Sequence, residues 1–317
     1  MVQPRSTFRD RASVTTLASF ASLAALGVLV GIAVVGAGCA EKPPVPAPSA
    51  SAPPPPPPPE PVHEPYAFHQ KAWDVYIPSS FRGNNGTYDL VVHFHGLPSL
   101  ERRAIDQVGL DAVVIAVNHG AFADHYQDPY KDPQALERII AFADDQLAAS
   151  GRGEGRKLGR LALSGWSAGA GSIGRILGFA GNHERIDALL LEDGLFTSYS
   201  NVKKKVMNMG PLERFVRYAQ AASRGEKLMV ITHSAVPTYG YPSMIETTTG
   251  LLRMSAFERT DVDLVASTGM HQTSECHVGS FHLMGFSGDG VQAHMDHVQK
   301  MGETSWPYLK SRWATKK

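Results

Sequence analysis

The chain has 317 residues, with 30 Lys or Arg and 30 Asp or Glu, so its formal net charge at pH 7 is zero. This balance and the lack of a basic stripe argue against a nucleic-acid-binding protein, and the run VKKK at 202–205 is typical of a solvated face. Only two cysteines are present, Cys39 and Cys276, so the fold must rest on its core rather than on a disulfide framework.

The first 39 residues have the layout of an export signal. Three arginines precede a mildly apolar run over residues 12–38, which ends in small residues before Cys39. The pattern resembles a bacterial lipoprotein signal peptide, 1–38, with Cys39 as the lipidated first residue of the mature protein. Gly36 departs from that pattern, in which leucine is usual. The run is also long enough to span a bilayer, so an uncleaved anchor stays open.

Residues 39–65 are predicted to form a proline-rich linker, because they offer almost no apolar side chain for a core. Proline favours the extended polyproline conformation, so about twenty such residues reach on the order of 60 Å. We therefore expect a lipid-anchored protein of the bacterial cell envelope, on the outer membrane or cell surface. Residues 66–317 then form one α/β domain, for which their length suffices.

Seven β-rich runs follow in this domain, each ended by Pro, Gly, Asn or a polar residue, at 73–78, 88–95, 111–118, 160–165, 186–193, 227–233 and 280–288. Between them, residues 133–150 and 211–225 show apolar residues at helical spacing, and each opens with a proline suited to a first turn. Strands that are apolar on both faces and alternate with helices predict a mostly parallel central sheet with helices on both faces. In such sheets, chemistry gathers at the carboxyl ends of the strands.

The segment GWSAG at 165–169 joins one of these strands to a helical run. A serine on a sharp strand-to-helix turn needs glycines such as Gly165 and Gly169, because neighbouring side chains would clash. Such a turn exposes the Ser167 hydroxyl above the sheet and aims the N–H of Ala168 at a developing oxyanion. The segment therefore predicts a nucleophilic serine.

The strand order, the serine turn and a late histidine make the domain resemble the α/β-hydrolase superfamily. The resemblance implies an α/β-hydrolase fold and a catalytic histidine in the loop after the last strand. His294 and His297 both follow that strand. We prefer His294, which lies nearer the loop, and His297 stays open as an alternative base.

The acid that would orient the histidine has two candidates. The usual position, after the strand at 227–233, holds no aspartate and only a distant Glu246, which is expected to begin a helix. Asp193 stands at the end of the preceding strand of leucines, at the edge where we expect catalysis. A buried carboxylate there would fix the imidazole tautomer, so Asp193 is preferred and Glu246 is the alternative. A structural role for Asp193 in capping the turn also stays open.

The motif HFHG at 93–96 ends the strand that resembles the oxyanion strand of lipases and esterases. The resemblance implies that the N–H of Gly96 or Leu97 is the second oxyanion donor. A zinc site is the alternative explanation of these histidines, and its candidate ligands are His93, His95, His119 and His125. No acidic or cysteine partner stands at a characteristic spacing, so we expect no metal.

These features predict a serine hydrolase, most simply an esterase, that acts on a small or polymeric ester through an acyl-enzyme and needs no cofactor. A peptidase or amidase with the same residues stays open. So does a non-catalytic lipoprotein that binds an envelope partner on a hydrolase scaffold. Aromatic side chains that follow strand ends are candidates for the pocket wall, namely Trp166, Phe196, Tyr199, Tyr239 and Tyr241.

Overall fold

A computed structural model of the protein describes residues 63–84 and 86–315. The expected signal peptide, Cys39 and nearly all of the expected linker lie outside these residues. Among the helices of the described part, none is long and apolar enough to cross a membrane.

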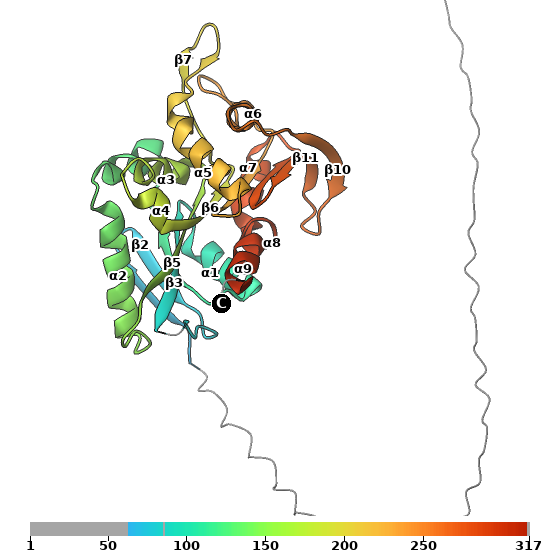
Figure 1. The fold of residues 1–317 in the computed structure, drawn as a ribbon. Helices are drawn as coiled ribbons and strands as arrows, with labels where there is room; N and C mark the ends of the chain where they lie inside the picture. The colour runs from blue at the N-terminus through green and yellow to red at the C-terminus, as the bar shows by residue number, and fades with distance from the viewer. Residues whose placement is uncertain (1–62, 85, 316–317) are drawn as a thin grey trace, which may run out of the picture. The chain divides into compact units, whose positions relative to one another are not determined.

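A ten-stranded sheet runs through the described domain (Figure 1). In spatial order its strands are β1 (Tyr66–Gln70), β2 (Trp73–Ile77), β4 (Val113–Val117), β3 (Thr87–Phe94), β5 (Lys157–Trp166), β6 (Ile186–Glu192), β9 (Leu228–His233), β12 (Phe281–Phe286), β11 (His271–Val278) and β10 (Thr260–Val265). The strands from β4 to β12 in this order pair in parallel, whereas both edges of the sheet are antiparallel.

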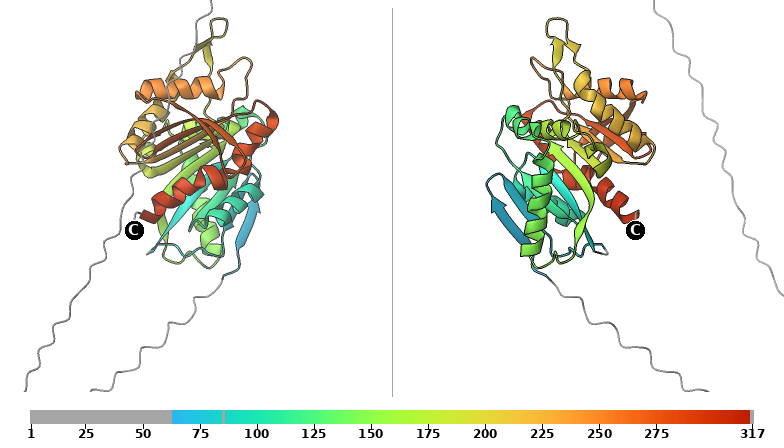
Figure 2. Two further views of the ribbon diagram at one scale, coloured as in Figure 1. Left: turned by 90° about the vertical axis from the view of Figure 1, so that its right-hand side faces the viewer. Right: turned by 60° about the vertical axis from the view of Figure 1, so that its left-hand side comes forward.

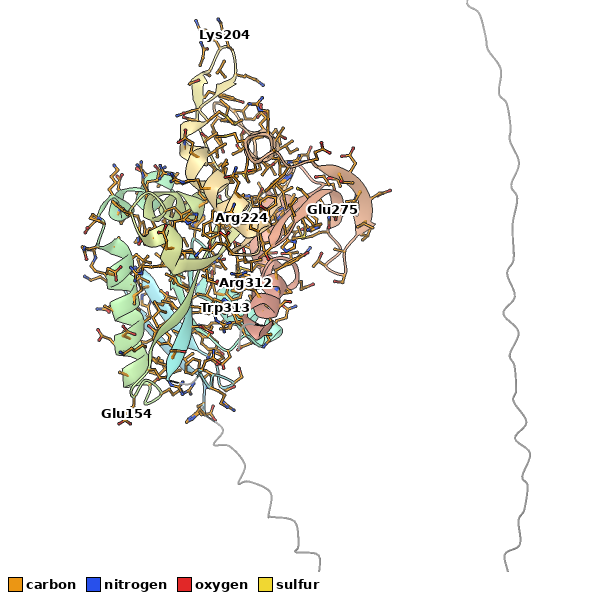
Figure 3. The ribbon with its side chains drawn as sticks, in the orientation of Figure 1. Glu154, Lys204, Arg224, Glu275, Arg312 and Trp313 are labelled. Atoms are coloured by element: carbon orange, nitrogen blue, oxygen red, sulfur yellow. The ribbon has the colours of Figure 1, made fainter. Side chains whose placement is uncertain are left out.

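Helices connect the parallel strands, as parallel pairing requires. They are α1 (Pro98–Val108), α2 (Ala135–Ala149), α3 (Ala170–Ile176), α4 (Asn182–Arg185), α5 (Glu213–Ser223), α6 (Met244–Ser255), α7 (Val291–Gln299), α8 (Met301–Thr304) and α9 (Trp306–Thr315). Short 3-10 helices are η1 (Ala123–Tyr126), η2 (Asp128–Lys131), η3 (Ser167–Gly169) and η4 (Gly210–Leu212). A hairpin of β7 (Tyr199–Asn201) and β8 (Val206–Met207) projects from the domain, with Lys204 at its tip (Figure 3).

The sheet buries a separate apolar core on each face. Along β3, Leu90, Val92 and Phe94 join the core beneath α2, α3 and α5, whereas Val91 joins the core beneath α1, α8 and α9. Figure 2 shows these two groups of helices on opposite sides of the sheet. The alternation follows from the two-residue period of a strand, whose successive side chains point to opposite faces. The expected fold class is therefore confirmed: a mostly parallel central sheet with helices on both faces.

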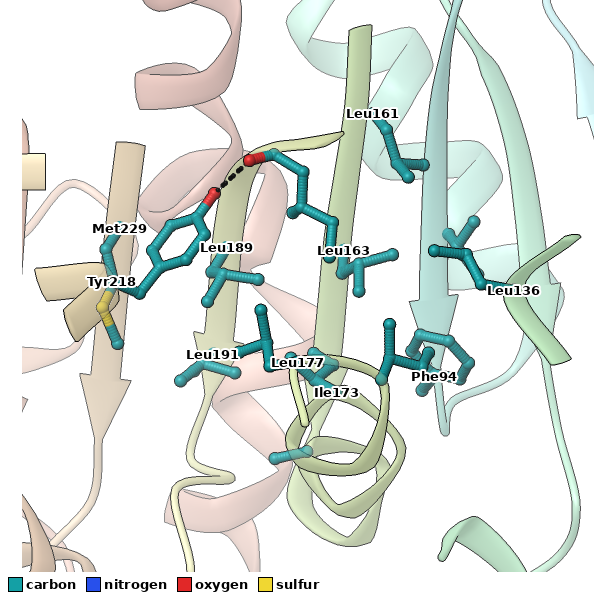
Figure 4. Close-up of a cluster of buried hydrophobic side chains, with 14 of the residues drawn as sticks. Phe94, Leu136, Leu161, Leu163, Ile173, Leu177, Leu189, Leu191, Tyr218 and Met229 are labelled. Carbon is teal, nitrogen blue, oxygen red and sulfur yellow. Dashed lines mark hydrogen bonds between the residues drawn. The ribbon is translucent and has the colours of Figure 1, made fainter. Parts of the chain in front are cut away.

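The core beneath α3 and α5 is close-packed around leucines of β5 and β6 (Figure 4). Leu163 and Leu189 are fully buried there, and the Tyr218 hydroxyl from α5 donates to the carbonyl oxygen of Ile186 at 2.9 Å. Truncating such a leucine to alanine typically costs about 2–5 kcal/mol. This packing holds α3, and with it the turn that precedes α3, against the sheet.

All seven predicted strands are present, but five further strands of the described residues, β1, β7, β8, β10 and β11, were not predicted. Edge strand β10 is almost wholly exposed, and β11 is exposed on alternate residues, so neither carries a continuous apolar run. Both predicted helices form, although α2 begins at Ala135, beyond the proline expected in its first turn. The helix after the serine is shorter than expected, because η3 occupies residues 167–169 and α3 ends at Ile176.

Candidate active site

The turn that carries Ser167 has the strained geometry expected from its sequence. Ser167 follows the last residue of β5 and has φ 50°, a left-handed conformation that is uncommon for residues other than glycine. A Cβ at Gly169 would lie 1.9 Å from the carbonyl oxygen of Phe94 on β3, so any larger residue would push the turn off the sheet. A Cβ at Gly165 would meet the backbone of Gly169 at 3.2 Å, which is also crowded.

Three side chains from distant parts of the chain form a hydrogen-bonded series at this turn. His294 Nε2 lies 2.9 Å from Ser167 Oγ, and His294 Nδ1 lies 2.6 Å from Asp193 Oδ2. An ionised carboxylate can only accept, so Nδ1 carries the proton and Nε2 is free to accept from the serine hydroxyl. The His294 side chain is 26% exposed, which leaves the series open to solvent on one side.

Asp193 stands directly after β6 and is held rigidly. Its φ is 46°, its side chain is 1% exposed, and it accepts bonds from both the N–H and the hydroxyl of Ser234 at 2.9 and 2.7 Å. Burial alone would raise the pKa of Asp193, but the hydrogen bond from His294 and those from Ser234 lower it below the ordinary value. Asp193 is therefore ionised at neutral pH. Ser234 occupies the position after β9 where the sequence lacked an acid, and its role escaped the sequence analysis.

Two interactions hold His294 besides the bond to Asp193. The indole N–H of Trp166 donates to the His294 carbonyl oxygen at 3.0 Å, and the two rings lie 4.7 Å apart. His297, one turn further along α7, is fully buried and its Nδ1 lies 2.8 Å from the Thr232 hydroxyl. The structure therefore brings His294, and not His297, to Ser167.

Glu246 lies in the first turn of α6, as expected, and completes a capping box with Ser243. Its carboxylate accepts from the Ser243 N–H at 2.8 Å and from the Tyr199 hydroxyl at 3.2 Å. Its pKa is lowered mainly by the bond from the Ser243 backbone. No hydrogen bond joins it to His294 in the described part of the chain, and its contacts are those of a helix cap.

The expected oxyanion donors lie in two segments, namely η3 after β5 and the loop between β3 and α1. Ala168 is the second residue of η3, where the N–H groups of a starting helix have no partner within the helix. The peptides of Gly96 and Leu97 are oriented by side chains: His93 Nε2 lies 3.0 Å from the carbonyl oxygen of His95, and Asn118 donates to that of Gly96 at 2.7 Å. Because a trans peptide points its N–H opposite to its C=O, these two bonds also fix the N–H directions of Gly96 and Leu97.

His93 and His95 do not face one side of a strand. β3 ends at Phe94, and His95 turns away with φ 70°, so that its ring stacks on Trp166 at 4.8 Å and its Nδ1 lies 2.9 Å from the Tyr126 hydroxyl. The two side chains therefore do not form the pair of zinc ligands that the sequence allowed. Among the described residues, no group of three or more histidine, cysteine or acidic side chains is arranged to hold a metal.

A cavity of about 510 Å³ opens beside the serine. Ser167 and Ala168 are among the residues that line it, and Phe196 and Tyr241 contribute an aromatic wall, with their rings 6.0 Å apart. Of the five aromatic residues expected at the pocket, only these two line it. Tyr239 is 90% exposed, Tyr199 binds Glu246, and Trp166 packs between His95 and His294. Gly96 and Leu97 are likewise not among the lining residues.

No family model and no curated protein matches the chain. Solved structures that are similar include a zinc-bound cold-adapted esterase from an Arctic intertidal metagenomic library, at 15% identity over 76% of this chain and 92% of the other, with a TM-score of 0.39. A poly(3-hydroxybutyrate) depolymerase from Bordetella parapertussis has 12% identity over 75% and 86%, with a TM-score of 0.41. A sugar hydrolase from Lactococcus lactis has 13% identity over 80% and 99%, with a TM-score of 0.42. Likenesses this distant assign no activity to the chain.

Proposed function

We propose that the protein is a serine hydrolase of the α/β-hydrolase type that cleaves carboxylic esters through an acyl-enzyme. The observation that carries the proposal is the hydrogen-bonded series from Ser167 through His294 to Asp193, beside a cavity that Ser167 lines. A nucleophilic hydroxyl, a neutral imidazole that can take its proton and an ionised carboxylate that fixes the imidazole tautomer are the three groups that acyl transfer by serine needs.

In this mechanism, Ser167 Oγ attacks the ester carbonyl carbon while its proton passes to His294 Nε2. The N–H of Ala168, with that of Gly96 or Leu97, stabilises the negative charge on the carbonyl oxygen, and each such donor is worth about 10²–10³ in rate. His294 then gives the proton to the departing alcohol oxygen, which leaves the acyl group on Ser167. Water repeats the sequence, so that one ester and one water yield one acid and one alcohol. The chain's own groups suffice for every step.

Labelling with a fluorophosphonate tests this proposal, because the reagent phosphonylates only an activated serine. We expect the wild-type protein to gain one adduct, mapped to Ser167 by peptide mass spectrometry, and to hydrolyse short p-nitrophenyl esters. The variants Ser167→Ala and His294→Gln should lose both properties while keeping the circular dichroism spectrum. If the protein takes up no reagent, or if the adduct maps to a residue other than Ser167, the proposal is wrong.

The location that we propose, the bacterial cell envelope, rests on sequence alone. Lipid on Cys39 and the proline-rich segment behind it would tether the domain at a distance from the membrane. The mature protein should then partition into detergent, and Cys39→Ser should accumulate as an unprocessed precursor. Mature wild-type protein that is fully soluble without detergent would count against lipidation.

A further inference from the structure

Two arginines line the cavity at a distance from the serine. Arg175 lies on α3, and Arg214 lies in the first turn of α5. Arg175 is eight residues beyond Ser167, which places its Cα about 12 Å further along the helical segment. The wall of the cavity therefore includes both the nucleophile and two positive charges.

Most of the hydrogen-bonding capacity of the two guanidinium groups is unused. Arg175 donates to the Gln127 side-chain oxygen at 3.0 Å, and Arg214 donates to the carbonyl oxygen of Gly174. A guanidinium carries five N–H donors, so several on each arginine are left for a ligand. Within residues 63–84 and 86–315, neither guanidinium forms an ion pair with a carboxylate, although Glu213 lies next to Arg214 in the chain.

The two positive charges repel each other. Partial burial lowers the pKa of Arg214 from its ordinary value, and the charges of Arg175 and Arg217 lower it further, against a smaller opposing effect of Glu213. A guanidinium group stays protonated at any working pH, so this repulsion persists. An anion placed between them would relieve this repulsion and would find planar donors suited to a carboxylate.

The geometry also indicates which part of an ester occupies the cavity. His294 must reach the leaving-group oxygen to protonate it, so the alcohol part lies on the His294 side of Ser167. The residues that line the cavity include Ser167 and Ala168 but not His294. The cavity therefore extends from the side of Ser167 that receives the acyl group.

We infer that Arg175 and Arg214 form an anion-binding subsite for the far end of the acyl group, so that the preferred substrates are esters whose acyl chain ends in a carboxylate or another anion. The aromatic wall of Phe196 and Tyr241 contacts the apolar middle of such a chain. This inference rests on the proposed function, because it identifies the substrate class of the same site.

The test compares esters that differ only in the charge of the acyl terminus. The charged probes are the p-nitrophenyl hemi-esters of adipic and suberic acids, and each has a neutral partner in which a primary amide replaces the free carboxylate. Both release p-nitrophenol, and spontaneous hydrolysis is subtracted. We expect kcat/KM of the wild-type enzyme to favour the carboxylate by about tenfold or more, and this preference to shrink in 0.5 M salt.

The double variant Arg175→Gln, Arg214→Gln should bring the ratio of the two kcat/KM values close to one. Because both esters are measured on the same sample, the ratio does not depend on the folded fraction. The single variant Arg175→Gln is a second check, because the Arg175 side chain is exposed and its substitution does not disturb folding. Arg217→Gln is the matched control, since Arg217 lies on α5 and is absent from the cavity wall. It should leave the preference intact. A wild-type ratio near one, or a ratio that the double variant does not change, overturns the inference.

Calorimetry separates this inference from the proposed function. The probe is the mono-p-nitroanilide of adipic acid, titrated into the Ser167→Ala variant with and without the two arginine substitutions. Binding that is lost with the arginines supports the subsite even if no ester is hydrolysed. Hydrolysis of both esters at equal rates, without arginine-dependent binding, leaves the hydrolase intact and removes the subsite.

Discussion

The described part of the chain contains two hydrogen-bonded series of a serine, a histidine and a carboxyl group, of which one includes Ser167 on the cavity wall and the other is buried. In the open series, His294 lies between Ser167 and Asp193. The buried series is formed by His93, Ser164 and Glu192. His93 Nδ1 lies 2.8 Å from Ser164 Oγ, which in turn lies 3.2 Å from the Glu192 carboxyl group. Ser164 precedes Ser167 by three residues, and Glu192 is the neighbour of Asp193.

The order of the hydrogen bonds differs between the two series. In the open one, the carboxylate binds the histidine and leaves the serine proton free to move to Nε2. In the buried one, the carboxyl group binds the serine, and His93 directs its Nε2 at the carbonyl oxygen of His95 instead. Because a carbonyl oxygen can only accept, the imidazole proton of His93 lies on Nε2, and Nδ1 accepts from the Ser164 hydroxyl. The Ser164 oxygen can then accept a hydrogen bond from a protonated Glu192. This arrangement is consistent when Glu192 is neutral.

The hydrogen bonds that each acid receives, rather than burial alone, separate the pKa values of the two acids. Glu192 is fully buried, which raises its pKa to about 7 in spite of the hydrogen bond from the Ser305 hydroxyl. Asp193 is nearly as buried, but it receives the bonds from His294 and Ser234 that lower its pKa. The same burial lowers the pKa of His93 to about 3. The contents of a Ser–His–acid series therefore do not identify a catalytic site, whereas access and the order of the bonds do.

Substituting each serine gives the largest expected contrast. Ser167→Ala should lower ester hydrolysis by about 10⁶-fold, since a triad without its nucleophile retains only the oxyanion hole and binding. Ser164→Ala should cost about 1–3 kcal/mol of stability, because its buried partners lose a hydrogen bond, but turnover per folded molecule should stay within a few-fold. The measurement is hydrolysis of a p-nitrophenyl ester. The turnover of each variant that still takes up the fluorophosphonate is normalised by active-site titration with that reagent. A comparable collapse in folded Ser164→Ala would mean that the buried series takes part in the chemistry.

The neighbouring acids give the second contrast. Asp193→Asn should lower turnover by up to about 10⁴-fold, because an amide favours the wrong imidazole tautomer of His294. Glu192→Gln should change turnover little, since the hydrogen bonds of Glu192 join it to Ser164 and Ser305 rather than to His294, and an amide keeps the size of the side chain. Near-normal turnover in folded Asp193→Asn would remove Asp193 from the mechanism and leave a Ser–His dyad.

The sequence predicted the open series far better than the buried one, for physical reasons. Ser167 stood in a turn motif that only small residues permit, and Asp193 ended an apolar strand, so both carried local signals. Ser164 and Glu192 both lay inside predicted apolar strands, at 160–165 and 186–193, so no turn or strand end marked either of them. The central strands followed from their apolar runs, whereas β10 and β11 at the sheet edge, which are mostly or partly exposed, carried none.

The buried carboxyl groups should also make stability fall with rising pH. Glu101 is 1% exposed and lies 3.4 Å from His93, and burial raises its pKa to about 8. The native state keeps this proton above the ordinary pKa, while the unfolded chain loses it, so the free energy of unfolding decreases as pH rises toward 8. Between pH 6.5 and 8 the loss due to Glu101 is about 2 kcal/mol, measured in urea unfolding as the change in the difference between the wild-type protein and Glu101→Gln.

The variant Glu101→Gln should flatten this decline, and Glu192→Gln should do so to a smaller extent, because the pKa of Glu192 is raised only to about 7. Buried histidines with lowered pKa values act in the opposite direction in this window, because the unfolded chain still binds protons near pH 6.5, but they contribute equally to the wild type and the variant and cancel in the difference. A difference between wild type and Glu101→Gln that stays constant from pH 6.5 to 8 would contradict a neutral Glu101 carboxyl group.

The smallest effect concerns a third carboxylate, Glu246, which belongs to neither series. It accepts bonds from the N–H and hydroxyl of Ser243 at the start of α6, so its contribution is to the helix end. Glu246→Gln should keep turnover within twofold and lower the free energy of unfolding by less than about 1 kcal/mol, because glutamine can still occupy that position of a capping box. Ser243→Ala, which removes the cap hydroxyl, should cost about 1 kcal/mol. Urea unfolding together with ester hydrolysis measures both quantities on the same samples. If Glu246→Gln instead abolished turnover in a folded protein while Asp193→Asn did not, the acid would lie after β9, and the bond between Asp193 and His294 would be structural.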